Sequence, residues 1–161
     1  MKIKEITPCL WFDSEAEEAA RFYISIFPDS GIDHIAYFGK EGFEHHGKKE
    51  GTVLTVNFRL NGQPFVALNG GPVFRFSEAI SFQVFCDTQE EIDYYWDTLT
   101  DGGMESQCGW LKDKYGLSWQ IVPSELSELM SDPAASERVT AAFLPMKKLE
   151  IDVLRKAAAG G

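Results

Sequence analysis

Residues 6–14, ITPCLWFDS, and residues 80–88, ISFQVFCDT, decide the fold, because each is an apolar strand pattern that ends in Asp-Ser or Asp-Thr. An acidic segment with helical spacing follows each of them at once. Ser14 and Thr88 are the expected N-cap residues, and in both copies a glutamate three residues later completes a capping box. The repeat therefore predicts one strand-helix module in each half of the chain.

The first half continues with a helix and three strands. Apolar residues with helical spacing from Ala16 to Phe27 predict a helix that Pro28 ends. Asn61-Gly62 is a strong signal for a two-residue hairpin turn, because a type I′ turn needs positive φ at both positions. The three strands are predicted at about 32–38, 53–60 and 64–68, and a surface loop rich in glycine and charge is predicted at 39–51.

The second half repeats this order and adds helices. We predict a strand at about 79–86, a helix at 88–100 with Ile92, Tyr95, Trp96 and Leu99 buried, short strands at 104–107, 110–113 and 117–122, and helices after Ser124, after Asp132-Pro133 and at about 148–158. The class is α+β. Two βαβββ modules, at about 3–72 and 78–123, and a C-terminal helical extension at about 124–158 are expected to form a single domain over residues 1–161.

Composition excludes several classes of function. With 15 basic and 25 acidic residues the formal charge is −10, which repels nucleic acid and anionic lipid. The sequence has no stretch of the ~20 apolar residues that span a membrane, and its start is unlike a signal peptide. Three cysteines, an odd number, are expected to be reduced thiols in a cytoplasmic protein.

Four segments together resemble a known family: ITPCLWFDSEAEEAARFYISIFP, NGQPFVALNGGP, GWLKDKYGLSWQIVP and RVTAAFLPMKKLEIDVL. They resemble the PhnB-like family, which is often labelled 3-demethylubiquinone-9 3-methyltransferase and belongs to the vicinal oxygen chelate superfamily. This superfamily includes glyoxalase I, bleomycin-resistance proteins and extradiol dioxygenases. The resemblance implies that the paired modules form a curved mixed sheet around a cup.

The resemblance also implies where metal ligands would stand. In metal-dependent members, the first and last strands of each module supply imidazoles and carboxylates. The matching positions here are Thr7 and Ser81 on first strands, and Asn69 (or Ala67) and Gln120 on last strands. Neutral hydroxyls and amides give little affinity for Zn, Ni or Fe, so we expect no metal.

We expect no other cofactor either. The glycines of the chain do not form the strand-to-helix turn that usually holds S-adenosylmethionine, so methyl transfer is not expected.

Strand alternation gives the candidate cup residues. Thr7, Cys9 and Trp11 share one side of the first strand. The sides expected to line the cup in the second module carry Ser81, Gln83 and Phe85 on one strand and Ser118, Gln120 and Val122 on another. The predicted ligand-binding residues are Thr7, Cys9, Trp11, Asn69, Ser81, Gln83, Trp110 and Gln120. The alternative is a half-polar strand face that water fills. Trp119 is expected in the core, and Lys112, Asp113 and Lys114 are expected to be exposed turn charges.

Two classes of function fit this pattern. The first is a small-molecule binding protein with a neutral, metal-free cup, which we prefer. The alternative is a metal-independent enzyme acting on a small, partly apolar substrate, although the cup offers no evident general base and the catalytic residues are unknown. Cys9 and Cys108 are expected to be ordinary thiols rather than nucleophiles, because no histidine lies close to either in the sequence. In both cases we expect a homodimer.

Overall fold

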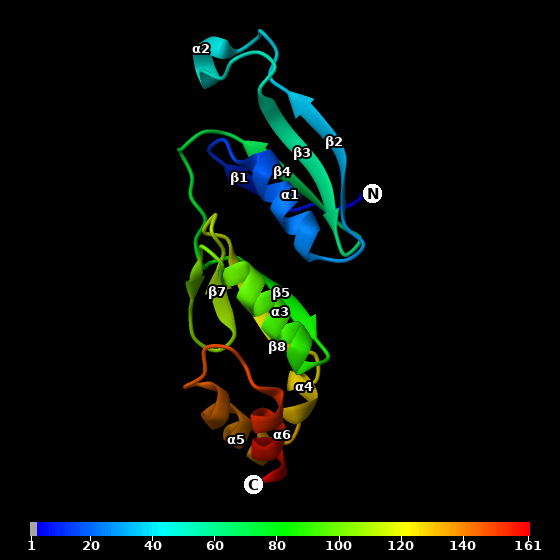
Figure 1. The fold of residues 1–161 in the computed structure, drawn as a ribbon, viewed down its shortest axis with the longest axis vertical. Coiled ribbons are helices and arrows are strands. Elements are labelled where there is room, and N and C mark those ends of the chain that lie inside the picture. The colour runs from blue at the N-terminus through cyan, green and yellow to red at the C-terminus, as the bar shows by residue number, and fades with distance from the viewer. Residues whose placement is uncertain (1–2) are drawn as a thin grey trace. The chain divides into compact units, whose positions relative to one another are not determined.

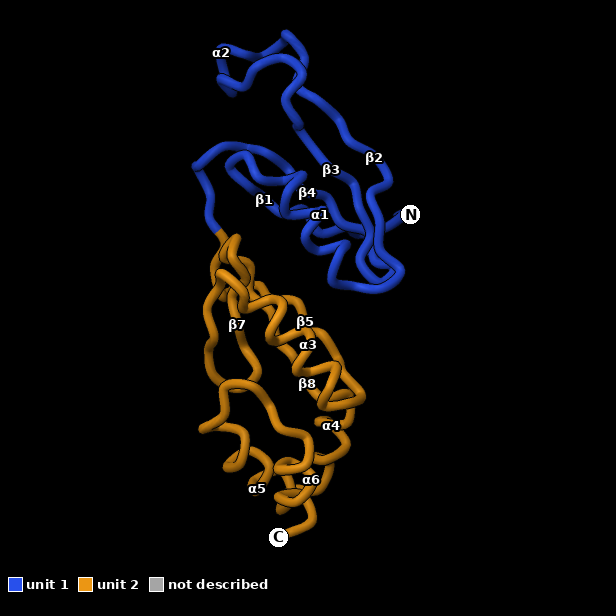
Figure 2. Tube along the Cα trace, in the orientation of Figure 1, with its two compact units in different colours: residues 1–75 blue, residues 76–161 orange. Residues whose placement is uncertain are grey.

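The computed structural model describes residues 3–161, which divide into two compact units. The first unit ends at Arg75 and the second begins at Phe76, as Figure 2 shows in two colours. This boundary falls between the two predicted modules. Each unit is an α+β structure with its own four-stranded mixed sheet, and the sheet is not closed into a barrel.

The first unit has the predicted order of elements (Figure 1). Its sheet has the strand order β1-β4-β3-β2, in which β1 is parallel to β4 and the other pairs are antiparallel. The loop predicted at 39–51 contains a one-turn helix. The elements are β1 (Cys9–Phe12), α1 (Ala16–Ile26), β2 (Gly31–Tyr37), α2 (Phe43–His46), β3 (Val53–Leu60) and β4 (Gln63–Asn69).

Helix α1 covers one face of this sheet. Its small buried residues, such as Ala19 and Ala20, let the helix approach the strands closely, and Tyr23 stacks on Phe58 of β3 with ring centroids 6.5 Å apart. Side chains alternate along β3: Val56, Phe58 and Leu60 are buried, and Asn57 between them is exposed. The hairpin turn is also confirmed: Asn61 and Gly62 have φ values of 48° and 75°.

The second unit repeats the arrangement and adds the C-terminal helices. Its sheet has the order β5-β8-β7-β6, and β5 is parallel to β8. The elements are β5 (Ser81–Cys86), α3 (Gln89–Thr100), β6 (Met104–Glu105), β7 (Trp110–Lys112), β8 (Ser118–Pro123), α4 (Leu126–Leu129), α5 (Pro133–Phe143) and α6 (Ile151–Ala159). Every predicted element of this half is present, with ends shifted by a few residues.

Helix α3 packs on the sheet through three of the four predicted residues. Ile92, Trp96 and Leu99 are buried, and Tyr95 is half-buried at the edge of the stripe. The C-terminal helices have a separate apolar cluster around Val139, Leu149 and Leu154. No helix within residues 3–161 is long and apolar enough to cross a membrane.

The two helix starts differ from each other. Thr88 caps α3 as predicted: its side chain accepts a hydrogen bond from the Glu91 backbone, and the Glu91 side chain reaches back to the N-cap backbone. Ser14 does not cap α1, so that prediction was wrong. The N-cap position is Glu15, whose side chain makes no capping bond, and the first helical N–H, on Ala16, donates instead to Asn69 Oδ1 at 2.8 Å.

Candidate functional site

The sheet of the second unit has one face away from α3, which we call the open face. Alternation puts Trp119 and Ile121 of β8 on the buried side and Ser118 and Gln120 on the open face. Gln120 pairs with Gln83 of β5 on one side and with Trp110 of β7 on the other. Three predicted site residues of this unit therefore form one row across adjacent strands.

Hydrogen bonds link the predicted polar residues of this face. Gln120 Nε2 donates to Ser81 Oγ at 2.8 Å, and Gln83 Nε2 donates to Gln120 Oε1 at 3.3 Å. The amides are thus held in one orientation by their neighbours. The indole of Trp110, which is half-buried, gives the row an apolar end. A fixed row of uncharged donors and acceptors beside an aromatic wall is suited to binding an organic molecule.

Ser118 was expected on the same side as Gln120 but is not among the predicted ligand-binding residues. It is 1% exposed, and within residues 3–161 its Oγ is the one buried side-chain oxygen or nitrogen with no hydrogen-bond partner. Leaving a buried hydroxyl unpaired costs about 1–3 kcal/mol. The hydroxyl borders a cavity of about 100 Å³ that Trp110, Leu111 and Lys112 also line. A buried polar atom without a partner at the wall of a cavity is a place where a bound group can supply one.

Lys112 is not the exposed turn charge that the sequence suggested. It is the last residue of β7 and pairs with Ser118 of β8 across the strands. Its ammonium contacts Glu78 Oε1 at 2.5 Å, and the hydrogen bond from Lys112 lowers the pKa of the Glu78 carboxyl. Both side chains line the cavity beside Ser118. The open face therefore carries an ion pair at one edge.

Asp113 also differs from the prediction of an exposed charge. It is 3% exposed, and its carboxylate accepts hydrogen bonds from the backbone of Tyr115 and Leu117 and from Trp119 Nε1. These bonds fix the turn between β7 and β8. Trp119 lies in the core, as predicted, and Asp113 is the partner that its indole N–H needs there.

In the first unit, Cys9 and Trp11 lie on the sheet face away from α1, because Leu10 and Phe12 occupy the buried side of β1. Trp11 is held firmly: its Nε1 donates to Gly71 O at 2.8 Å, and a Cβ at position 70 would lie 2.1 Å from its ring. Thr7 is half-buried in the segment before β1. Cys9 and Trp11 therefore share a face, as predicted.

Asn69 is placed elsewhere, which corrects its assignment to the ligand-binding residues. It is 6% exposed and lies on the α1 side of the sheet. Its Oδ1 accepts from Ala16 N, and its Nδ2 donates to Val53 O at 3.0 Å. The register explains the difference, because Cys9 pairs with Val66, so that Val66 and Leu68 occupy the open side while Ala67 and Asn69 face the helix.

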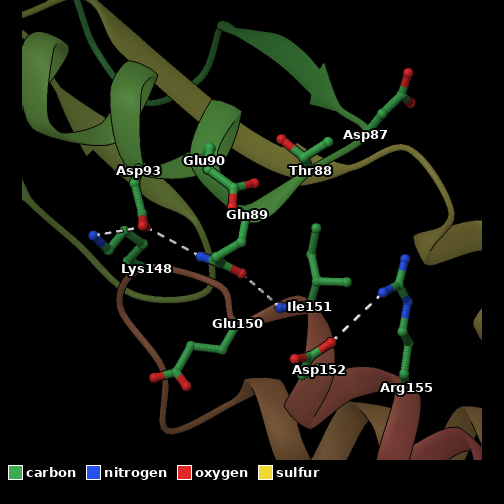
Figure 3. Close-up of a pocket in the computed structure, with 10 residues that line it drawn as sticks. All are labelled: Asp87, Thr88, Gln89, Glu90, Asp93, Lys148, Glu150, Ile151, Asp152 and Arg155. Carbon is green, nitrogen blue, oxygen red and sulfur yellow. Dashed lines mark hydrogen bonds and ion pairs between the residues drawn. The ribbon is translucent and has the colours of Figure 1, made fainter.

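A larger cavity, of about 580 Å³, lies between the start of α3 and the start of α6 (Figure 3). Its polar groups bind one another. Gln89 donates to Asp93 and accepts from the backbone of Ile151, while the Lys148 ammonium lies 2.9 Å from Asp93 Oδ1. The hydrogen bond with Lys148 lowers the pKa of Asp93, and the same bond raises the pKa of Lys148. These contacts join the C-terminal extension to α3, and we do not assign a ligand to this cavity.

The thiols differ in environment. Burial raises the pKa of Cys86, which lies on the α3 side of β5, to about 12. Partial burial also raises the pKa of Cys9. Both shifts favour the unreactive thiol form over the thiolate, in line with the expectation that Cys9 is an ordinary thiol.

The residues of the open faces do not make up a metal-binding set. Within residues 3–161 no three His, Cys, Asp or Glu side chains are close enough together to hold a metal ion. His46 has a structural role: its Nδ1 accepts from Lys48 N at 3.0 Å, and its ring packs on Phe38 with centroids 4.5 Å apart. His34 lies in β2, apart from the adjacent pair His45 and His46 in α2.

Comparisons with known proteins show what this chain is similar to. The sequence pattern of the family described as 3-demethylubiquinone-9 3-methyltransferase matches residues 4–122. The solved structure of the PhnB protein from Bacillus cereus is 38% identical and has a TM-score of 0.66, with 74% of this chain and 99% of that chain covered.

More distant structures share the fold alone. A protein from Pseudomonas aeruginosa is 15% identical with a TM-score of 0.60, with 75% of this chain and 98% of that chain covered. The fosfomycin resistance protein FosX from Mesorhizobium loti is 12% identical with a TM-score of 0.55, with 82% and 100% covered. None of the curated proteins matches this chain.

Proposed function

Since this chain belongs to the 3-demethylubiquinone-9 3-methyltransferase family, with a fold of the vicinal oxygen chelate superfamily, we propose that it binds a small, partly apolar organic molecule on the open face of its second sheet. The binding uses no metal ion. Ser81, Gln83, Gln120 and Trp110 are the contacting residues in this proposal. Thr7, Cys9 and Trp11 form a separate candidate set on the first unit. Residues 1–161 act as a single domain.

One observation carries the proposal: Gln83, Gln120 and Ser81 are linked by hydrogen bonds, and Trp110 pairs with Gln120 on the neighbouring strand. Amides exposed on a sheet face gain little from bonding one another rather than water. Aligned beside an indole, they can match the polar atoms of a flat molecule while the ring covers its apolar part.

The name of the family suggests methyl transfer, which we do not expect of this chain. Both strand-to-helix connections, Asp13 to Glu15 and Asp87 to Thr88, lack glycine. The first helical N–H of α1 already donates to Asn69, and Thr88 already accepts from the Glu91 backbone. The usual nucleotide-type site needs a glycine-rich turn in a doubly wound parallel sheet. Stoichiometric binding of S-adenosylmethionine in calorimetry would contradict this expectation.

The test uses the tryptophan indole N–H signals in NMR spectra during a screen of small aromatic compounds. Trp110 should shift on binding, while Trp119, which is buried and bonded to Asp113, should stay in place. Substitution Gln120→Leu should weaken binding of the best compound roughly tenfold, the effect of one lost hydrogen bond to a buried group. Gln63→Leu, an exposed glutamine of β4, is the matched control. Equal affinity in both variants would contradict the proposal.

The alternative, a metal-independent enzyme, requires a titratable group beside the ligand. Glu78 and Lys112 meet that requirement on this face. Chemical change of the bound compound, lost entirely in Lys112→Gln or Glu78→Gln, would favour the enzyme; graded loss of affinity without change of the compound favours a binding protein.

The proposed absence of metal has its own measurement. Freshly purified protein should contain far less than one equivalent of Ni, Zn, Fe or Mn by elemental mass spectrometry, because the donors at the matched positions are neutral. About one equivalent would show that the strand matching is wrong.

We also propose a cytoplasmic homodimer with no nucleic-acid partner. The charge of −10 and three free cysteines support the compartment and the exclusion of nucleic acid. Exposed aromatic side chains on the sheets, such as Phe85 at 61% and Tyr37 at 56%, are surfaces that a second copy can cover. Light scattering at micromolar concentration should give twice the monomer mass.

A further inference from the structure

We propose that the ligand of the open face is a carboxylic acid with a flat apolar body, and that Glu78 holds the place of its carboxylate beside Lys112 and Ser118. The inference rests on the proposed function, because it names the ligand class of the same face. It depends on three side chains that are not among the predicted ligand-binding residues.

Hydrogen-bond donors for an anion lie in a second row of the open face. Ser118 of β8 pairs with Ser81 of β5 and with Lys112 of β7, so the three side chains stand on adjacent strands. Neighbouring strands are about 5 Å apart, and one carboxylate can therefore reach two of these groups. Ser81 Oγ already accepts from Gln120 Nε2, so its proton is directed elsewhere.

The buried hydroxyl of Ser118 is the feature that requires a ligand group. It is 1% exposed, has no partner among the described residues, and borders the cavity of about 100 Å³. That volume corresponds to about three water molecules, enough for a carboxylate but too small for a whole organic ligand. The rest of the ligand would lie along Trp110, which also lines the cavity.

The Glu78 carboxylate occupies the position beside Lys112 that we assign to the carboxylate of the ligand. Its carboxylate contacts the Lys112 ammonium, while its side chain is 65% exposed and that of Lys112 is 32% exposed. An exposed ion pair of this kind is weak, so a ligand carboxylate that also binds Ser118 can displace Glu78. The internal carboxylate thus competes with the ligand for one lysine.

The experiment uses benzoate as the probe and benzamide, its neutral analogue, as the control ligand, with the Trp110 indole signal as readout. Benzoate should bind at least tenfold more tightly than benzamide, because a charged hydrogen bond is stronger than a neutral one. Ser118→Ala and Lys112→Gln should each weaken benzoate binding about tenfold and leave benzamide binding within twofold. Glu78→Gln should strengthen benzoate binding several-fold by removing the competitor.

Lys114→Gln is the matched control, since it removes an exposed lysine and the same charge. If benzamide shifts Trp110 as strongly as benzoate, and Glu78→Gln changes neither affinity, the inference is overturned while the proposed function stands. If neither probe shifts Trp110 in any variant, and the wider screen also gives no ligand, both are overturned. An effect of Lys114→Gln equal to that of Lys112→Gln would reduce the result to general charge attraction and would also overturn the inference.

Discussion

The two units have the same order of elements, but the strand that pairs with the first strand of each unit carries its amide on opposite faces: Asn69 of β4 on the helix side and Gln120 of β8 on the open side. In the first unit Asn69 lies on the helix side and serves α1, while Cys9 and Val66 hold the middle of the open side. In the second unit Gln83 and Gln120 hold the corresponding open positions, and α3 is capped by its own Thr88. One topology therefore has a buried amide in a structural role in one copy, and in the other copy it has open-face amides to which we assign a binding role under the proposed function.

The difference shows how a repeated module can divide its tasks. When a helix supplies its own cap, the last strand is free to carry side chains chosen for the open face. When it does not, as in α1, a polar residue on the helix side of the last strand accepts the bond from the helix start. The following predictions test this division, beginning with the largest effect.

The largest expected effect is the difference in thiol reactivity between the two units. A pKa of about 12 against the ordinary 9.0 makes Cys86 roughly 1,000-fold poorer in thiolate than an unperturbed thiol at neutral pH. Cys9, on the open side of the first sheet, should react far faster than Cys86, yet no faster than a free thiol. Labelling with iodoacetamide followed by peptide mass spectrometry measures both rates, and unfolded protein serves as the control. Equal rates in the folded protein would contradict the placement of Cys86.

The same shift has a consequence for stability. Because the folded-state pKa of Cys86 lies above the unfolded value, the stabilisation from its neutral thiol is complete below pH 9.0 and is lost as the pH rises toward 12. Relative to Cys86→Ala, the wild-type protein should lose stability over that interval in denaturant titrations.

Asn69→Ala should lower the free energy of unfolding by about 3 kcal/mol, since it removes the cap of α1 and leaves Val53 O without its buried donor. The matched control is Asn57→Ala, which truncates the same residue type at an exposed position of β3 and should change stability by less than about 0.5 kcal/mol. Urea unfolding measures both variants. A loss as small as that of Asn57→Ala would remove Asn69 from its structural role.

Thr88→Ala should cost about 1 kcal/mol, because a capping box lost from one helix start is replaced in part by water. Thr88→Ser keeps the hydroxyl and should retain most of the stability. If Thr88→Ala were as damaging as Asn69→Ala, the contrast between a local and a remote cap would not hold.

The elements that depend on neighbouring residues could be predicted from the sequence. The turn at Asn61-Gly62, the capping box at Thr88 and the alternation of β3 each need only a short window of sequence. That Ser81, Gln83 and Gln120 lie on one face was likewise predictable, because strand alternation alone selects those side chains.

The predictions that were wrong concern residues whose environment depends on long-range strand pairing. Ser14 has the right local sequence for a cap, but Asn69 reaches the same helix from a distant strand. The side on which Asn69 lies follows from the register of β1 with β4, which no local pattern fixes. Lys112 and Asp113 belong to a charged run at the end of β7. Only the fold shows that Asp113 accepts from the Trp119 indole and that Lys112 pairs with Ser118.

The bond between Ala16 N and Asn69 Oδ1 also sets an order of events during synthesis. A helix whose first N–H is satisfied by residue 69 cannot complete its start until the ribosome has released the chain beyond that residue. Helix α3 carries its own cap, so the bonds of its start need only residues 88–91. The hydrogen bonds at the start of α1 therefore form only after β4 has been synthesised, whereas those at the start of α3 depend on neighbouring residues alone.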